Sequence, residues 1–306
     1  MRKFLAPNSI SPEAKQALTG PAFASPEYPP LDDIAAWRRH RAAQNEAIIA
    51  FFPPKFDNVA IRWEKIAAVD VVRATPSAPL HALGKIFLHF HGGALAYLGG
   101  APLGPMTAAC AARIGSDVIA VDYRMPPDYP YPAALDDGLA VYRDVIREFG
   151  RENVIVGGES AGGNISAALL LYARDKGLPM PAALVLLTPE VDLTESGDTF
   201  QTLLGLDRMG LLTPANLLYA AGQPLDHPYL SPLFGDLSGF SPTFLQAGTR
   251  DLFLSNTVRT HRKIRSAGVE AELHVWEAMP HGGFGGAPED DEVNAEIRRF
   301  LARYQH

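Results

Sequence analysis

The amino-acid sequence predicts an α/β fold in which a central, mostly parallel sheet is flanked by helices. Three observations lead to this prediction. Strand-like and helix-like segments alternate between residues 85 and 187, and the alternation resumes at residue 243, as in a parallel sheet with helices on both faces. Apolar runs such as KIFLHF (85–90) are continuous, which is typical of strands buried on both faces. The chain has 306 residues of which 47% are hydrophobic, enough for a large core.

Each element is expected from its local pattern. Short β-branched and aromatic runs between turn residues predict strands, and apolar residues at helical spacing predict helices. Two short strands are expected between residues 61 and 74, and further strands over 85–90, 117–122, 154–156, 182–187, 243–247 and 271–276. Helices are expected over 31–49, 106–115, 133–149, 165–174, 255–266 and 291–304, with two shorter helical stretches over 200–204 and 214–221.

Two segments do not fit the alternation. Residues 1–60 contain many prolines around one helical stretch, and residues 189–240 are rich in proline, glycine and aspartate. A long insertion of this kind in a compact fold usually covers a functional site. We therefore expect residues 61–188 and 241–306 to form the catalytic domain. The other two segments are expected to form a helical cap over it.

Composition and charge exclude several kinds of partner and site. The net charge is −7 and basic residues occur only in short groups, so nucleic acid and anionic membrane surfaces are not expected partners. The single cysteine, Cys110, allows no intramolecular disulfide and no cysteine-based metal site. It lies in an apolar helical stretch, where a packed thiol is expected. The N-terminal apolar run ends at Pro7, and no run approaches the roughly 18 residues of a membrane span, so the cytoplasm is the expected location.

The segment NVIVGGESAGGNIS (153–166) contains the motif G-x-S-x-G between an expected strand and an expected helix. A nucleophile at such a turn needs neighbours without side chains, because the strand and the helix approach closely there. Ser160 is therefore the expected nucleophile, and the N–H of Ala161, beside the first helical turn, is expected to bind an oxyanion. The motif alone arises by chance about 0.1 times in a chain of this length. Its interpretation therefore depends on further residues.

The loop HGGA (91–94) directly follows the expected strand over 85–90. Glycines at the end of a strand let successive N–H groups turn toward one point, as the stabilisation of a tetrahedral oxyanion requires. We therefore expect Gly92, Gly93 or Ala94 to supply oxyanion N–H groups. The alternative is an ordinary glycine turn. His91 is expected to support the loop.

His281 is the expected general base among nine histidines. It follows the last expected strand, in the loop MPHGGFGG, from which a side chain can return to the carboxyl edge of the sheet. Asp251 follows the strand over 243–247 and completes the order Ser, Asp, His. A carboxylate at this place fixes the imidazole tautomer and stabilises its charged form. Glu190 and Asp192, one strand earlier, are the alternative carboxylates.

These motifs together resemble a known family. The set HGGA, DYRMPPDYPYPAA, GESAGG, GTRDLF and MPHGGF is similar to that of the hormone-sensitive-lipase-like branch of the α/β-hydrolase superfamily, the bacterial family IV carboxylesterases. The resemblance implies an α/β-hydrolase fold with Ser160, Asp251 and His281 as the catalytic triad. The sequence departs from the family pattern at three places. HGGA replaces HGGG, Glu159 stands where aspartate is frequent, and HGGF replaces HGF.

The activity implied by the resemblance is that of a serine carboxylesterase that acts through an acyl-enzyme and needs no metal or cofactor. A lactone is an internal ester, so lactone hydrolysis with the same triad is the first alternative. The second alternative is a ligand-binding member of the family without catalysis. Since the expected strand over 271–276 is the last of the series and has few charges, we also expect a homodimer formed by edge pairing.

Bulky apolar residues in both cap segments predict the size of the substrate. The first segment contributes residues such as Phe23, Phe51 and Phe52, and the second contributes residues such as Met209 and Leu212. If they line the pocket, burial of acyl methylenes favours binding until the limited volume is filled, so short- to medium-chain esters are expected. The alternative is that these residues form the core of the cap itself.

Overall fold

The computed structural model describes residues 5–19, 27–50, 56–80 and 85–304. Within these residues the strands form one sheet in the order β1-β2-β4-β3-β5-β6-β7-β8. From β4 to β8 neighbouring strands are parallel, whereas β2 is antiparallel to β4 and forms a hairpin with β1. The predicted α/β fold with a mostly parallel sheet is confirmed.

The expected elements are present, with shifted ends. The strands are β1 (Val59–Ile66), β2 (Val69–Pro76), β3 (Ile86–Phe90), β4 (Asp117–Val121), β5 (Val154–Glu159), β6 (Ala183–Leu187), β7 (Thr243–Arg250) and β8 (Ala271–Pro280). The helices are α1 (Pro12–Ala17), α2 (Ile34–Ile49), α3 (Leu103–Ile114), α4 (Ala133–Phe149), α5 (Ala161–Asp175), α6 (Thr199–Thr202), α7 (Thr213–Ala220), α8 (Leu254–Ser266) and α9 (Pro288–Ala302). Helix α1 was not expected from the sequence, and β8 runs on to Pro280, so that it ends directly before His281.

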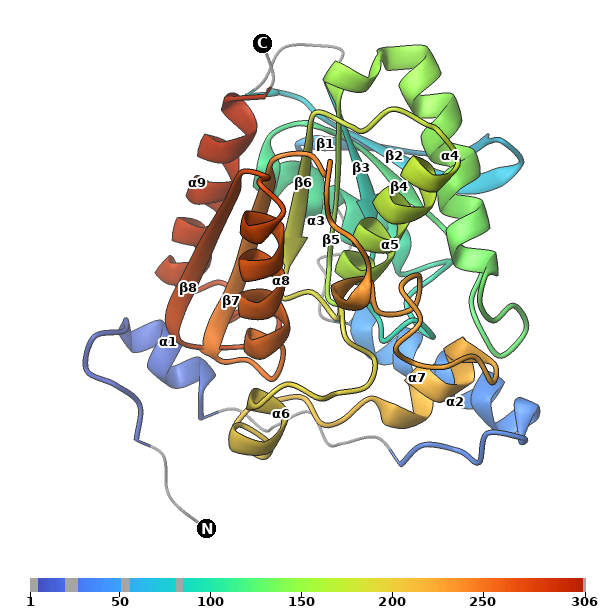
Figure 1. Ribbon diagram of the computed structural model, residues 1–306. Helices are drawn as coiled ribbons and strands as arrows, with labels where there is room; N and C mark the ends of the chain where they lie inside the picture. The colour runs from blue at the N-terminus through green and yellow to red at the C-terminus, as the bar shows by residue number, and fades with distance from the viewer. Residues whose placement is uncertain (1–4, 20–26, 51–55, 81–84, 305–306) are drawn as a thin grey trace.

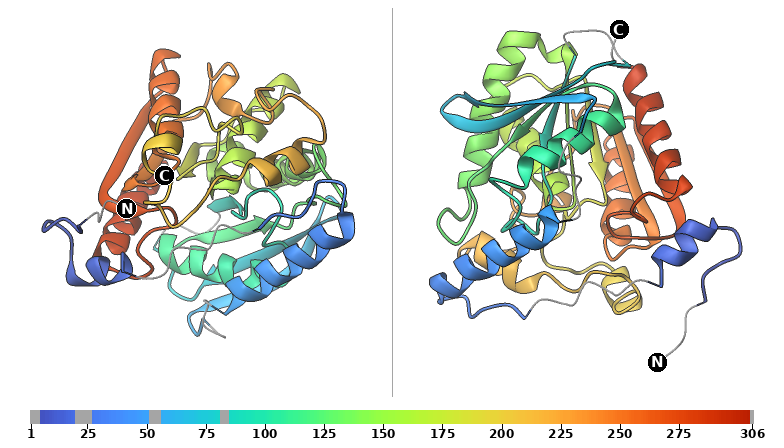
Figure 2. Two further views of the ribbon diagram at one scale, coloured as in Figure 1. Left: turned by 90° about the horizontal axis from the view of Figure 1, so that it is seen from below. Right: turned by 180° about the vertical axis from the view of Figure 1, so that it is seen from behind.

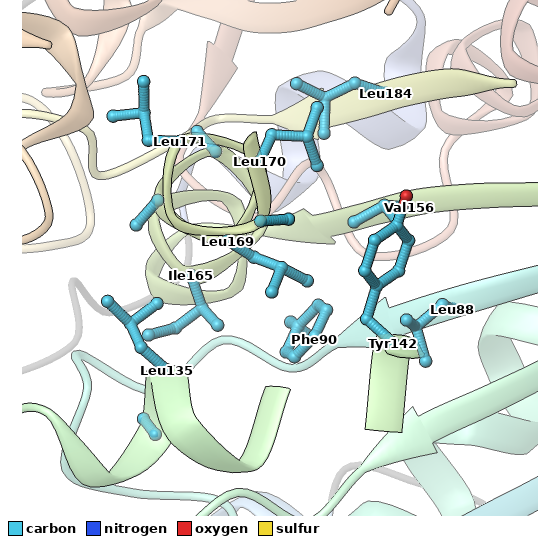
Figure 3. Packing of buried hydrophobic residues seen from close by; sticks show 14 of the residues in the cluster. Leu88, Phe90, Leu135, Tyr142, Val156, Ile165, Leu169, Leu170, Leu171 and Leu184 are labelled. Atoms are coloured by element: carbon cyan, nitrogen blue, oxygen red, sulfur yellow. The ribbon is translucent and has the colours of Figure 1, made fainter. Parts of the chain in front are cut away.

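Helices cover both faces of the sheet, as Figures 1 and 2 show. Helices α4, α5 and α8 pack on one face, where Phe90 of β3 lies beside Ile165 and Leu169 of α5, and Leu88 of β3 lies beside Tyr142 of α4 (Figure 3). Helices α3 and α9 pack on the other face. Cys110 of α3 is buried in this second layer, and burial raises the pKa of its thiol to about 11. The expectation of a packed thiol is confirmed.

Helices α2, α6 and α7 lie beyond the carboxyl ends of the parallel strands (Figure 1). Trp37 of α2 is buried in one hydrophobic cluster with Phe200 of α6 and Leu212, which directly precedes α7. Residues from both predicted cap segments therefore share a core. Phe23, Phe51 and Phe52 lie outside the described residues.

Helix α1 lies apart from α2, beside α9 (Figures 1 and 2). The N–H and the Oγ of Ser11 donate hydrogen bonds of 2.6 and 2.8 Å to the two carboxylate oxygens of Glu289. Ala14 is buried in the same cluster as Phe300 of α9. The prediction placed all of residues 1–60 in the cap, but α1 packs against the last helix of the chain.

The parallel strands place the predicted functional residues at one edge of the sheet. The loop 91–94 follows β3, Ser160 follows β5, and Asp251 and His281 follow β7 and β8. Parallel strands have their carboxyl ends at the same edge, so four segments that are distant in sequence meet there. No helix in the described part of the chain is long and apolar enough to cross a membrane.

Candidate active site

Ser160 stands at a sharp turn between β5 and α5. Its backbone has φ 55° and ψ −121°, a conformation that residues with side chains rarely adopt. Its N–H donates to the carbonyl of Leu187 at 2.9 Å, and its carbonyl accepts from the N–H of Glu190 at 3.0 Å. A Cβ on Gly162 would lie 1.9 Å from the carbonyl oxygen of Phe90. The last glycine of G-x-S-x-G is therefore required by the close approach of α5 to β3.

His281 and Asp251 are in direct contact. Nδ1 of His281 lies 3.2 Å from Oδ1 of Asp251, whose carboxylate is fully buried. The same oxygen accepts the N–H of Phe253 at 2.8 Å, and the ring of Phe253 packs edge-on against the imidazole. Burial alone would lower the pKa of His281, but the charge and the hydrogen bond of Asp251, followed by the charge of Asp207, outweigh it and raise this pKa to about 9.

The two alternative carboxylates are placed differently. The Asp192 carboxylate accepts hydrogen bonds from Thr194 and Ser196 and an ion-paired hydrogen bond of 2.6 Å from Arg259. Glu190 is buried, and neither of its carboxyl oxygens has a hydrogen-bond partner within the described residues. Burial raises the pKa of Glu190 to about 8, so its neutral form is favoured at neutral pH. Among these candidates, Asp251 is the carboxylate hydrogen-bonded to the imidazole.

Asp207 is a residue of the site that the sequence analysis missed. It lies in the inserted segment 189–240, and its Oδ1 accepts the N–H of His281 at 3.0 Å. Its Oδ2 accepts the N–H of Leu252, next to Asp251, at 2.7 Å. One buried carboxylate therefore ties together the two loops that hold Asp251 and His281. It lies in an irregular stretch without periodicity, so no sequence signal distinguished it from other aspartates.

The loop after β3 is tightly folded. Gly93 has φ 117°, and its carbonyl accepts the N–H groups of Ala96 and Tyr97 at 3.0 and 2.9 Å. Ala94 adopts φ 50° despite its Cβ, so alanine occupies a left-handed position in HGGA. Among the turn and loop hydrogen bonds of the described residues, none uses the N–H of Gly92, Gly93 or Ala94.

His91 supports this loop from behind. Its ring stacks on the Tyr123 ring with 4.2 Å between the ring centroids. The Tyr123 hydroxyl donates a hydrogen bond of 2.7 Å to the His91 carbonyl. Nδ1 of His91 lies 2.7 Å from the carbonyl of Gly92. Burial lowers the pKa of His91 to about 4, so the ring is neutral and structural.

Ser160, His281 and the glycine loop line one pocket of about 690 Å³. We call one side of its wall the apolar part. It comes from the predicted cap segments and the loop after β3, and it includes Tyr28, Ile48, Leu98, Met209 and Leu212. We call the other side the polar part. It comes from the sheet and from α3 and α9, and it includes Arg113, Glu159, Gln246 and Asn294. Tyr28 and Met209 line the pocket and also pack against the cluster in which Trp37 and Phe200 are buried, so the bulky cap residues contribute both to the pocket wall and to the core of the cap.

Comparisons with known proteins identify the family. A family model described as alpha/beta hydrolase fold matches residues 87–284, more than half of the chain. The chain is 32% identical to an acetyl-hydrolase of Streptomyces hygroscopicus, over 74% of this chain and 77% of that protein. The crystal structure of an esterase, E25, superposes with a TM-score of 0.89 at 33% identity, covering 100% of this chain and 98% of that one.

A further solved structure, the hormone-sensitive lipase homologue EstE7 from a metagenome library, matches with a TM-score of 0.79 at 30% identity. The match covers 88% of this chain and 93% of that one. The predicted family and fold are confirmed. This chain belongs to the hormone-sensitive-lipase-like, bacterial family IV branch of the α/β-hydrolase superfamily and is a carboxylic ester hydrolase.

Proposed function

We propose that the protein is a serine esterase that hydrolyses short- to medium-chain carboxylic esters through an acyl-enzyme on Ser160. The observation that supports this most directly is the 3.2 Å contact between Asp251 Oδ1 and His281 Nδ1, at a pocket that Ser160 also lines. With Nδ1 held by the carboxylate, Nε2 is the nitrogen free to accept a proton.

In the first half of the proposed reaction, Ser160 Oγ attacks the ester carbonyl as His281 Nε2 takes its proton. The resulting oxyanion accepts N–H groups of the loop 92–94 and of Ala161. When the tetrahedral intermediate collapses, His281 returns the proton to the leaving alcohol. Water then attacks the acyl-enzyme by the same route, and the carboxylic acid leaves.

The proposed chain length rests on the apolar part of the pocket. A wall that includes Ile48, Leu98 and Met209 favours hydrocarbon, and a volume of about 690 Å³ limits how much of it fits. The name of the acetyl-hydrolase relative supports a small acyl group. We propose that α2, α6 and α7 act as the cap that encloses this part.

We also propose a homodimer formed by pairing of two β8 edges. Strand β8 is at one end of the sheet, and Val275 at its centre is 42% exposed. An unpaired edge of this kind can accept a second strand. Light scattering at micromolar concentration should give twice the mass of the chain, and a monomeric mass would exclude this arrangement.

The esterase proposal is tested by Ser160→Ala with p-nitrophenyl butyrate as substrate. Loss of a triad nucleophile removes several orders of magnitude of kcat, and the wild type should give a burst of p-nitrophenol if deacylation is slower than acylation. Ser238→Ala, an exposed serine on the surface, is the matched control and should keep full activity. A folded Ser160→Ala protein with wild-type turnover would exclude Ser160 as the nucleophile.

A further inference from the structure

The polar part of the pocket has no role in the mechanism proposed above. It includes Arg113 of α3, Glu159 of β5, Gln246 of β7 and three residues of α9, all on the face of the sheet that α3 and α9 cover; the three are Asp290, Asp291 and Asn294. Glu159 is the residue directly before Ser160, so this part adjoins the proposed nucleophile. A substrate bound at Ser160 therefore has polar groups of the protein within reach on this side.

The Arg113 guanidinium is incompletely bonded to the protein. Its Nη1 lies 3.6 Å from Glu159 Oε2, longer than a hydrogen bond, and its buried Nε has no hydrogen-bond partner within the described residues. The side chains of Arg113 and Glu159 are 29% and 37% exposed, and both line the pocket. Both groups can therefore form hydrogen bonds with a molecule in the pocket.

Both groups are charged. Burial alone would raise the pKa of Glu159, but the Arg113 guanidinium outweighs it and holds this pKa below its usual value. The charge of His281, whose own pKa is raised, also lowers the pKa of Glu159. Burial lowers the pKa of His89 to about 4, which keeps it neutral. The Asp290 carboxylate accepts hydrogen bonds of 2.6 to 3.0 Å from N–H groups of the loop 284–287.

The pairing of Arg113 with Glu159 favours a neutral ligand group between them, and Asp291 of α9, which also lines the pocket, further disfavours an anion. An anionic group would be attracted to Arg113 but repelled by Glu159 at close range. A cationic group would be attracted to Glu159 but repelled by Arg113. A hydroxyl group can do both, since it accepts one hydrogen bond and donates another. A hydrocarbon chain does neither, so it would displace solvent from two charged groups without replacing the lost hydrogen bonds, which is unfavourable.

We propose that the polar part of the pocket selects esters that carry a hydroxyl group, which accepts a hydrogen bond from Arg113 and donates one to Glu159. The proposal rests on the proposed esterase function and adds a substrate class to it. Hydrogen bonds to charged groups are strong enough for discrimination of about tenfold or more in kcat/KM. The hydroxyl can be part of the acid or of the alcohol, and the test separates the two.

The experiment compares two pairs of esters that differ only in a hydroxyl and a methyl group. Ethyl 6-hydroxyhexanoate with ethyl heptanoate probes the acid, and 4-hydroxybutyl acetate with pentyl acetate probes the alcohol. The wild type should prefer the hydroxyl member of one pair by about tenfold or more. The double variant Arg113→Met/Glu159→Gln, which removes both charges together, should lose this preference. The preference is measured as the ratio of the two kcat/KM values within each pair, so a change common to both members does not affect it.

Arg147→Met is the matched control. This arginine is on the surface of α4, paired with Asp144, and its removal should leave the preference intact. If the double variant does not fold, Glu159→Gln, of nearly equal size, should reduce the preference by itself. Three results would overturn the proposal. The wild type could show equal kcat/KM within both pairs, or the preference could survive in the double variant. The wild type could also prefer monoethyl adipate, whose carboxylate is charged, to ethyl 6-hydroxyhexanoate.

The same data distinguish this failure from failure of the esterase proposal. Wild-type hydrolysis of ethyl heptanoate or pentyl acetate that Ser160→Ala abolishes reports the chemistry without any hydroxyl. Their hydrolysis with no hydroxyl preference would overturn the substrate class alone. Hydrolysis that persists in Ser160→Ala would overturn the nucleophile.

Discussion

The two parts of the pocket differ in how they are built and in what they can recognise. The apolar part includes Ile48 and Met209, which come from segments outside the regular alternation, while the polar part includes Arg113 and Glu159, which are fixed on a helix and a strand of the catalytic domain. Apolar contact is roughly proportional to area and has no direction, whereas hydrogen bonds to charged groups require a matching group at a matching place. We infer that the apolar part limits the size of the substrate and the polar part its chemical identity.

The largest expected effect tests whether both parts serve one catalytic centre. Asp251→Asn should lower kcat by about 10⁴ for every ester, because the amide no longer fixes the imidazole tautomer or stabilises the imidazolium. The loss should be the same for apolar and hydroxylated substrates. Steady-state kinetics on ethyl heptanoate and ethyl 6-hydroxyhexanoate measures this.

Asp192→Asn is the comparison variant. Asp192 is hydrogen-bonded to Arg259 and not to His281, so its replacement should act mainly on stability, through the loss of a half-buried ion pair, and only mildly on kcat. Thermal unfolding of both variants separates the two effects. If Asp192→Asn proved the more damaging for kcat, the acid of the triad would have to be reassigned to the loop after β6.

The second prediction concerns the apolar part. Each acyl methylene buried there should favour binding by about 0.8 kcal/mol, roughly fourfold in kcat/KM, until the wall is overfilled. For p-nitrophenyl esters from acetate to palmitate, kcat/KM should peak at about four to eight acyl carbons and then fall. A flat profile would mean that Tyr28 and Met209 contribute only to the core of the cap. A maximum at palmitate would mean an open groove.

The residues that could be predicted from the sequence share a physical reason. Ser160, Asp251 and His281 each follow a strand of a parallel sheet, and such a sheet gathers its carboxyl ends at one edge whatever the intervening sequence. The glycine motifs were also informative, because close approach and positive φ exclude most other residues. Their spacing therefore carries information about three-dimensional structure that a single sequence can reveal.

The features that escaped prediction depend on contacts without a local signal. Asp207 is one of several acidic residues in an irregular segment, and only the fold brings it to His281 and Leu252. Arg113 is at the end of a helix, where a basic residue is also explained by the helix dipole. The placement of α1 on α9 depends on a contact between Ser11 and Glu289, near opposite ends of the chain. Contacts over such separations leave no periodicity or motif.

The smallest expected effect tests whether Asp207, in the inserted segment 189–240, raises the pKa of His281. His281 must be neutral to accept the Ser160 proton, so kcat/KM should rise as pH increases through the pKa of His281, which neighbouring carboxylates raise. Asp207→Asn removes one of these negative charges at 3.0 Å from the His281 N–H. The imidazolium is then less stable, its pKa falls, and the acid limb of the pH profile should move to lower pH.

The polar part provides the control for this shift. Glu159→Gln also removes a negative charge from the pocket, but within the described residues Glu159 makes its ion pair with Arg113 and has no hydrogen bond to His281. We expect a smaller displacement of the acid limb for Glu159→Gln than for Asp207→Asn, with kcat/KM measured from about pH 5 to about pH 10. An acid limb that moves to higher pH in Asp207→Asn, or that moves further in Glu159→Gln, would contradict this. A larger shift in Glu159→Gln would mean that the polar part, rather than the cap segment, sets the pKa of His281 in addition to selecting the substrate.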